Sequence, residues 1–372
     1  MQYVDEFRDP ALAKVLLNHI NQRVAQIPRA KQRPLQLMEV CGGHTHAIFK
    51  FGIDQLLPPE IEFVHGPGCP VCVLPMGRID GCIDIAKHPE VIFCTYGDAM
   101  RVPGKNGSLL DAKRLGADVR IVYSPLDALS LAEKNPNREV VFFGLGFETT
   151  MPSTALTLQQ ARRRNLKNFS VFCQHITIIP TLRSLLEQPD VRIDGFLAPG
   201  HVSMVIGSHP YAFITEEFHK PLVVTGFEPL DILQALAMLV DQIADGRCVV
   251  ENQYKRIVTE DGNHLALEAL ADVFELKASS EWRGLGEIAG SGVQLTADYQ
   301  SFDAESRFHV QPYQVADDPQ ARCGDVLTGR CKPIDCALFG KRCTPQTAFG
   351  ALMVSSEGAC AAYYQYRREP QQ

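Results

Sequence analysis

The sequence predicts an α/β protein with two Rossmann-like parallel-sheet domains and a third, mainly helical or irregular domain. Its 372 residues exceed what one ordinary hydrophobic core organises, since single cores rarely grow past about 250 residues. Between residue 35 and about residue 230, short apolar runs alternate with Gly-containing turns and helical patterns, which is typical of parallel βα units. That alternation stops after residue 245, so a different kind of domain is expected there.

The expected strands are seven short apolar runs, each of which ends close to a turn or a helical pattern. They span residues 35–40, 91–95, 119–124, 139–146, 169–175, 194–200 and 221–226. Helical patterns such as 149–165 and 229–244 separate them. Seven strands are more than one small sheet needs, so we divide them at the helix and Asn-Pro-Asn turn of residues 124–138.

The expected domain organisation follows from this division. We expect a helical segment over 1–34 that packs on the third domain. The α/β domains are expected over 35–130 and 131–245, and the third domain over 246–372.

Composition and charge exclude several classes of protein. A hydrophobic fraction of 45% with 21% charged residues is typical of a globular chain, and a net charge of −7 leaves no basic surface for nucleic acid. The first ten residues lack the layout of a signal peptide, and no apolar run approaches the roughly 18 residues that cross a bilayer. We therefore expect a soluble, cytoplasmic protein, in which the twelve cysteines serve metal binding, thiol chemistry or burial.

The first candidate site is the run Cys-Gly-Gly-His-Thr-His that begins at Cys41. It stands where a strand ends and a helix begins, so the unpaired N–H groups of the helix start are expected to favour a thiolate. A thiolate binds soft metals or attacks electrophiles, and His44 or His46 can add an imidazole within one turn.

The second candidate site is the Gly-Pro-Gly-Cys-Pro-Val-Cys loop that contains Cys69 and Cys72. Two thiols at this spacing share a metal or cycle to a disulfide, and the flanking prolines favour a loop over the helix start of a thioredoxin. A structural zinc site that also uses His65 and Cys41 is the alternative.

The third candidate site is the C-terminal cysteine segment. Five of the twelve cysteines fall between residues 323 and 360, at the spacing C-x7-C-x4-C-x6-C-x16-C. Four cysteinates complete a [4Fe–4S] cluster, so one cysteine is surplus, and zinc is the alternative metal. Cysteines outside the three sites are expected in the core: Cys82, Cys94, Cys173 and Cys248.

Three turns are expected to line a crevice at the carboxyl ends of the strands, where α/β sheets bind ligands. They are Gly-Phe-Glu-Thr-Thr at 146–150, Pro-Gly-His-Val-Ser at 199–203 and the Ser-Ser-Glu-Gly turn that contains Glu357. None of them matches a nucleotide-binding fingerprint.

Taken together, these motifs resemble the HypD family of hydrogenase maturation factors. The resemblance covers CGGHTHA at 41–47, GPGCPVC at 66–72, GFETT at 146–150, PGHVS at 199–203 and the tail that ends in SSEGAC at 355–360. It implies two α/β domains plus a [4Fe–4S] domain. It also implies a role in assembling the Fe(CN)2CO unit of [NiFe] hydrogenases, together with a HypC-type small chaperone and a HypE-type cyanide donor.

Carried over residue by residue, the resemblance implies distinct roles for the cysteines. Cys41 would bind iron together with the partner chaperone, and Cys69 and Cys72 would form a redox-capable pair that can also contact the metal. His44 and Glu357 would take part in the chemistry. The cluster ligands would be Cys323, Cys336, Cys343 and Cys360, with Cys331 outside the pattern.

Two other functions remain open from the sequence alone. One is an iron–sulfur dithiol oxidoreductase without a role in metal assembly, and the other is a zinc-stabilised interaction protein.

Overall fold

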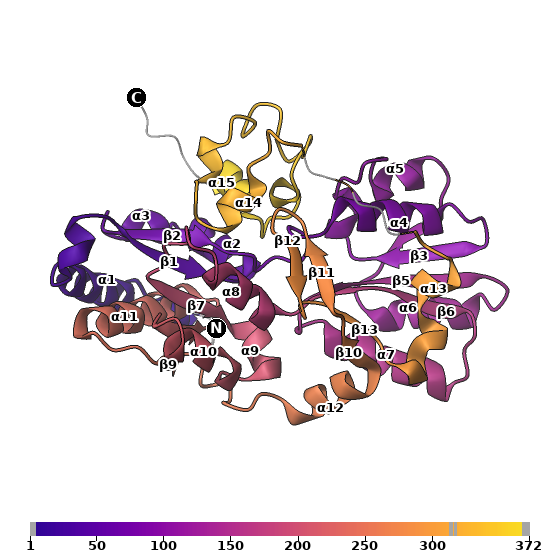
Figure 1. Cartoon of the computed structure of the whole chain (residues 1–372), viewed down its shortest axis with the longest axis horizontal. Coiled ribbons are helices and arrows are strands. Elements are labelled where there is room, and N and C mark those ends of the chain that lie inside the picture. The colour runs from indigo at the N-terminus through magenta and orange to yellow at the C-terminus, as the bar shows by residue number, and fades with distance from the viewer. Residues whose placement is uncertain (1–4, 312–314, 316–317, 367–372) are drawn as a thin grey trace.

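The computed structural model describes residues 5–311, 315 and 318–366 and contains two parallel sheets flanked by helices (Figure 1). Sheet A has the strand order β2 (Ile61–His65), β1 (Leu35–Glu39), β7 (Gly195–Pro199), β8 (Leu222–Thr225) and β9 (Val250–Asn252). Sheet B has the order β4 (Val119–Ile121), β3 (Val91–Thr95), β5 (Glu139–Gly146) and β6 (Phe169–His175). The predicted fold class and the seven predicted strands are confirmed.

Helices connect and cover the strands, and the longer ones agree with the helical patterns in the sequence. The α-helices are α1 (Pro10–Val24), α2 (Gly42–Lys50), α3 (Ile53–Leu56), α4 (Met76–Ala86), α5 (Leu109–Arg114), α6 (Pro125–Lys134), α7 (Met151–Arg163), α8 (Ile178–Leu186), α9 (Gly200–Ile206), α10 (Ala212–Glu216), α11 (Pro229–Asp245), α12 (His264–Val273), α13 (Ala304–Arg307), α14 (Cys323–Leu327) and α15 (Ala359–Tyr366). No helix in the described part of the chain combines the length and the apolar composition that crossing a membrane requires.

The two sheets are interleaved in sequence, so the expected boundary near residue 130 is wrong. Strands β1 and β2 pair with β7, β8 and β9, whereas β3 and β4 pair with β5 and β6. The chain thus builds two of the five strands of sheet A, then all of sheet B, and returns to complete sheet A. Local apolar runs give the strands but not their partners, because pairing depends on which faces are buried together.

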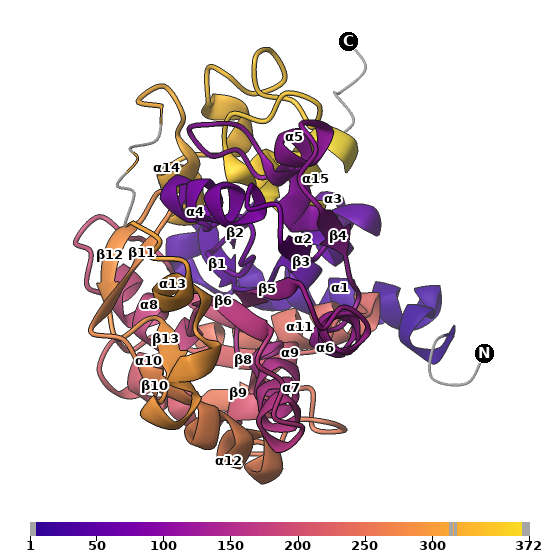
Figure 2. The ribbon, with the colours of Figure 1, turned by 90° about the vertical axis from the view of Figure 1, so that its right-hand side faces the viewer.

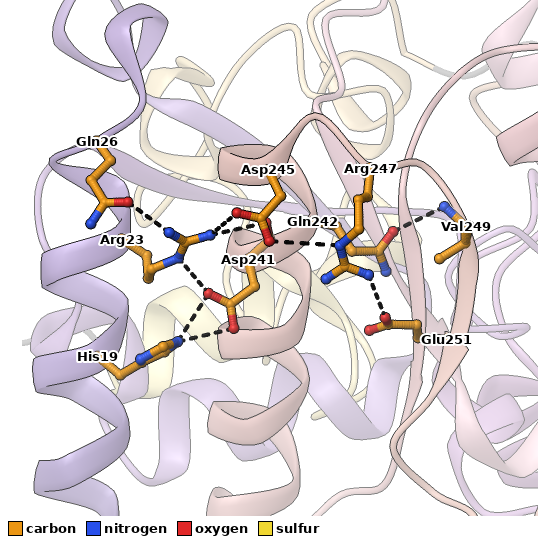
Figure 3. A network of polar contacts seen from close by, with 9 residues as sticks. All are labelled: His19, Arg23, Gln26, Asp241, Gln242, Asp245, Arg247, Val249 and Glu251. Carbon is orange, nitrogen blue, oxygen red and sulfur yellow. Dashed lines mark hydrogen bonds and ion pairs between the residues drawn. The ribbon is translucent and has the colours of Figure 1, made fainter.

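The N-terminal helix also differs from its expected place. Helix α1 packs along α11 of the sheet A lobe and not on the third domain, as Figures 1 and 3 show. Arg23 donates to Asp241 at 2.6 Å and contacts Asp245, and His19 lies 3.0 Å from the Asp241 carboxylate. Apolar residues of α1 enter the sheet A core beneath this polar network.

The segment 246–372 is not one domain. Its first strand, β9, completes sheet A, and residues 264–302 cover one face of sheet B. The segment includes two antiparallel pairs that the sequence patterns miss. The pair β10 (Phe274–Leu276) with β13 (Val293–Leu295) belongs to this cover, whereas β11 (Ser279–Trp282) with β12 (Gly286–Ala289) packs in the other core cluster and contacts α8. The cysteine-rich tail from residue 318 onwards packs on the sheet A lobe, with α15 against α2 and α14 against β2 (Figures 1 and 2).

The polar network between α1 and α11 gives a test of this placement. We expect Arg23→Met to speed hydrogen–deuterium exchange of the α1 amides, because the substitution removes the ion pairs that hold α1 on α11. Exchange in α15 of the tail should not change. Lys14→Met, which removes a charge from the exposed face of the same helix, is the matched control. Faster exchange in α15 but not in α1 would contradict the packing.

Candidate thiol site between the two sheets

The candidate site lies at the topological switch point of each sheet, where successive strands are added toward opposite edges. In sheet A this switch point falls between β1 and β7, and in sheet B between β3 and β5. Cys41 follows β1, His201 follows β7, Asp98 follows β3 and Glu148 follows β5. Burial is the main cause that raises the pKa of the Tyr211 phenol, and the nearby Glu148 and Cys41 raise it further. Since Cys41 follows a strand of sheet A and Glu148 a strand of sheet B, groups from the carboxyl ends of both sheets lie near Tyr211.

Cys41 occupies the N-cap position of α2, as the sequence predicts. The predicted shift toward thiolate is wrong, because the pKa of the thiol is raised to about 12. Burial is the main cause, and the carboxylates of Glu357 and Glu39 add to it. The N–H groups of Gly43 and His44 at the helix start act in the opposite direction but do not compensate.

A buried pair, Glu39 with His65, holds the backbone around Cys41. Glu39 is fully buried and accepts hydrogen bonds from the Cys41 N–H at 2.9 Å and from the Thr45 hydroxyl. His65 Nδ1 lies 2.7 Å from the Glu39 carboxylate. The sequence analysis missed Glu39, although a carboxylate two residues before Cys41 in an otherwise apolar strand is a usable signal.

The imidazole ring of His44 stacks on the ring of Phe227. The two rings lie 4.6 Å apart, and His201 covers the other face of Phe227 at 3.8 Å. Burial lowers the pKa of both imidazoles, so each is biased toward its neutral form. Phe227 belongs to the second Gly-Phe-Glu turn, at 226–228, which the sequence analysis did not place in the site.

Cys69 and Cys72 form a disulfide in a buried loop directly after β2. The loop packs on the start of α2, where the Gly42 N–H donates to the Gly68 carbonyl at 3.2 Å. A Cβ at Gly68 would collide with the backbone of Cys41, so the loop reaches this position only because the residue is glycine. The two sequence motifs are therefore one structural unit.

A short tail segment, residues 355–360, contacts this unit from the other side. Ser355 donates to Asp98 at 2.8 Å, which ties the segment to sheet B. A Cβ at Gly42 would lie 2.5 Å from Glu357 Cβ, and a Cβ at Gly358 would lie 3.1 Å from Cys72 Sγ. Glu357 is exposed on one side, and its pKa is raised by partial burial and by the carboxylates of Asp98 and Glu39.

The same segment ends at Cys360, which lines a cavity in the tail. Four cysteines face this cavity among apolar side chains such as Val326 and Leu338: Cys323, Cys336, Cys343 and Cys360. Cys331 lines a different cavity, beside β2. The four thiols are not already gathered around one point, since no group of three or more His, Cys, Asp or Glu in the described residues is placed to hold a metal ion.

The donor set nevertheless fits an iron–sulfur cluster. Burial raises the pKa of the Cys360 thiol, and the neighbouring cysteines raise it further. Four thiolates in an apolar cavity repel one another unless a cationic group binds them. Gly350 leaves the space beside Cys323 Sγ that a Cβ would fill.

Glu148 is the other buried carboxyl of the site, in the Gly-Phe-Glu-Thr-Thr turn. One of its oxygens accepts the Ile178 N–H at 3.1 Å, which caps α8, and the other has no partner among the described residues. Burial raises the pKa of Glu148 to about 7. Glu148 therefore joins the switch point of sheet B to the helix that crosses over to sheet A.

This geometry defines a class of protein: a two-sheet α/β protein with a thiol at a helix start, an adjacent cysteine pair and a cysteine-rich tail that closes over both. The family model described as "HypD: Hydrogenase formation hypA family" matches residues 11–367. The chain belongs to the HypD family of hydrogenase maturation factors.

Similar proteins match over nearly their whole length. The chain is 68% identical over 369 residues to the hydrogenase maturation factor HypD of Escherichia coli K12, covering 99% of each chain. It is 60% identical over 370 residues to HypD of Rhodobacter capsulatus, covering 98% of each. It is 51% identical over 377 residues to the hydrogenase expression/formation protein HupD of Azotobacter chroococcum, covering 100% of this chain and 98% of the relative.

The raised pKa of Glu148 predicts a pH-dependent stability. Its folded pKa of about 7 lies above the ordinary value of 4.5, so folding disfavours the ionised form. Below pH 4.5 the carboxyl is protonated in both states and has no effect. As the pH rises to 7, the unfolded state gains stability by ionising.

Glu148→Gln should therefore be more stable than the wild type by an amount that grows from pH 4.5 to 7 and then levels off at roughly 3 kcal/mol. The glutamine retains an acceptor for the Ile178 N–H. Denaturant unfolding at several pH values measures the difference, with the exposed Glu187→Gln as the control. A difference that does not vary with pH would contradict the assignment.

Proposed function

We propose that this chain is the scaffold on which the Fe(CN)2CO unit of [NiFe] hydrogenase is assembled before transfer to the hydrogenase large subunit. The observation that carries the proposal is that one tail segment, 355–360, adjoins the helix start at Cys41 and the Cys69–Cys72 disulfide and supplies a cysteine to the tail cavity. Its Glu357 adjoins the helix start at Cys41, its Gly358 adjoins Cys72, and its Cys360 lines the tail cavity.

Cys41 is the proposed ligand of the iron that is assembled. Burial is the main reason that the pKa of the free thiol is raised, and the carboxylates of Glu357 and Glu39 raise it further. The same negative charges favour a divalent cation, so iron binding replaces the proton by Fe²⁺ and releases H⁺. Soft thiolate ligands hold low-spin iron that carries CN and CO. Because the metal must displace this proton, iron binding to Cys41 is expected to strengthen as the pH rises.

Cys69 and Cys72 are the proposed electron donors of ligand transfer. Conversion of the dithiol to the disulfide releases two electrons and two protons, as reductive removal of cyanide from a thiocyanate requires. In this scheme His44 orients the site through its contacts with Phe227 and Thr225, and Glu357 moves protons at its solvent-facing side. Direct contact of the two sulfurs with the iron is part of the same proposal.

The tail cysteines are the proposed site of a resident [4Fe–4S] cluster. Cys323, Cys336, Cys343 and Cys360 share one cavity, and Cys331 stands apart from it. A bound cluster would supply single electrons to restore the dithiol. We further propose that the protein works in the cytoplasm with a HypC-type chaperone and a HypE-type cyanide donor.

The two other functions left open by the sequence differ from this proposal in the metals and thiols that they require. A zinc-stabilised interaction protein would contain zinc and no iron. A dithiol oxidoreductase needs no third thiol beside the pair, whereas Cys41 lies against the loop of Cys69 and Cys72. The placement of Cys41 therefore favours metal assembly.

Substitution of Cys41 tests the proposal. We expect Cys41→Ala to fold and to keep its iron–sulfur content, but to lose the CN and CO stretching bands from the infrared spectrum of the anaerobically purified complex. Cys248→Ala is the matched control, because Cys248 precedes β9 at the opposite edge of sheet A and should keep the bands. Bands of full intensity in Cys41→Ala would remove this residue from the iron site.

A further inference from the structure

Close contacts made by Gly68 and Gly358 lie on the two sides of the Cys69–Cys72 disulfide, and this suggests that reduction of the disulfide moves a neighbouring segment. We propose that opening the disulfide displaces the tail segment 355–360 and so moves Glu357 relative to Cys41. The inference rests on the proposed redox use of the pair, and it concerns how that pair regulates the neighbouring iron site.

On one side, the backbone just before Cys69 is fixed in place. The preceding residue, Gly68, touches the backbone of Cys41 so closely that it has no space for a Cβ. Its carbonyl accepts the Gly42 N–H, and the Gly66 N–H donates to the Glu39 carbonyl at 2.9 Å. The loop is therefore fixed to the end of β1 and to the start of α2.

On the other side, the Cys72 end meets the tail. A Cβ at Gly358 would lie 3.1 Å from Cys72 Sγ and would collide with the Leu352 carbonyl. Cys72 is 1% exposed, so its sulfur has protein rather than solvent beside it. The sulfur of Cys72 therefore lies beside the backbone of Gly358, so a change in its position changes the surroundings of Gly358.

Reduction requires such a movement. A disulfide plus two electrons and two protons gives two thiols, and a dithiol reductant supplies both electrons and both protons as it becomes a disulfide itself. Bonded sulfurs lie about 2.05 Å apart, whereas non-bonded heavy atoms settle at about 3.5–4.0 Å. The sulfurs must therefore separate by roughly 1.5 Å, and because both cysteines are buried, this separation alters their contacts with the surrounding protein.

The tail segment transmits this shift to the iron site. Glu357 directly precedes Gly358 and packs on Gly42, which follows Cys41 in the chain. Displacement of Gly358 thus changes the position of the Glu357 carboxylate beside Cys41. Cys360, two residues further on, lines the tail cavity, so the movement also reaches the cysteine cluster.

Hydrogen–deuterium exchange of the full-length, anaerobically purified protein tests the inference. Two amides report on the segment: Gly358 N–H, which donates to the Ser355 carbonyl, and Ala362 N–H, which donates to the Gly358 carbonyl, both at 2.9 Å. We expect peptides over 351–362 to exchange at least about tenfold faster after reduction with dithiothreitol than in the oxidised protein. The exchange rate of peptides from α7 should not change. The iron and sulfide contents must be equal in both samples.

A double variant, Cys69→Ser with Cys72→Ser, separates the disulfide from other effects of the reductant. It should show the fast exchange with and without dithiothreitol, because it cannot form the bond. Equal exchange over 351–362 in oxidised and reduced wild type would overturn the inference. A reductant effect of full size in the double variant would also overturn it, since the disulfide would then not be its origin.

The proposed function fails by a different result. Redox-dependent exchange together with undiminished CN and CO bands in Cys41→Ala would support the movement and refute the iron site. Loss of the bands in Cys41→Ala with exchange that does not respond to reduction would do the reverse.

Discussion

The arrangement of the cysteines depends on three close contacts that only glycine permits. Gly68 meets the backbone of Cys41, Gly42 meets Glu357, and Gly358 meets Cys72. At each of the three positions a Cβ would lie closer to its neighbour than ordinary packing allows. The N-terminal motif, the cysteine loop and the tail therefore form one body, although more than 280 residues separate the loop from the tail segment.

Charge explains why this body suits a cation. Glu39 and Glu357 come from opposite sides of Cys41, and Asp98 lies next to Glu357. Burial is the main cause that raises the pKa of the Cys41 thiol, and Glu357 and Glu39 add to it against the effect of the helix start. Carboxylates beside a thiol are compatible with the proposed binding of a metal ion.

The sequence predicts seven of the nine strands of the two parallel sheets, the longer helices and the three cysteine groups, because apolar runs and motif residues are local signals. It does not predict that β1 pairs with β7, since that pairing joins residues 158 positions apart, such as Leu37 and Gly195, through burial rather than through a local pattern. The same limit explains why α1 is misplaced and why Glu39 is missed. The raised pKa of Cys41 comes mainly from tertiary burial and in part from Glu357, neither of which a local sequence pattern shows.

The central claim is that the tail cysteines and the Cys69–Cys72 pair act as one electron-transfer unit. Stepwise photochemical reduction of the anaerobic protein, followed by thiol trapping and mass spectrometry, tests it most directly when the wild type is compared with Cys336→Ala. If the proposed four-iron cluster is present in the wild type and lost in the variant, light should open the disulfide in the wild type and leave it closed in the variant. Equal opening of the disulfide in both proteins would contradict it.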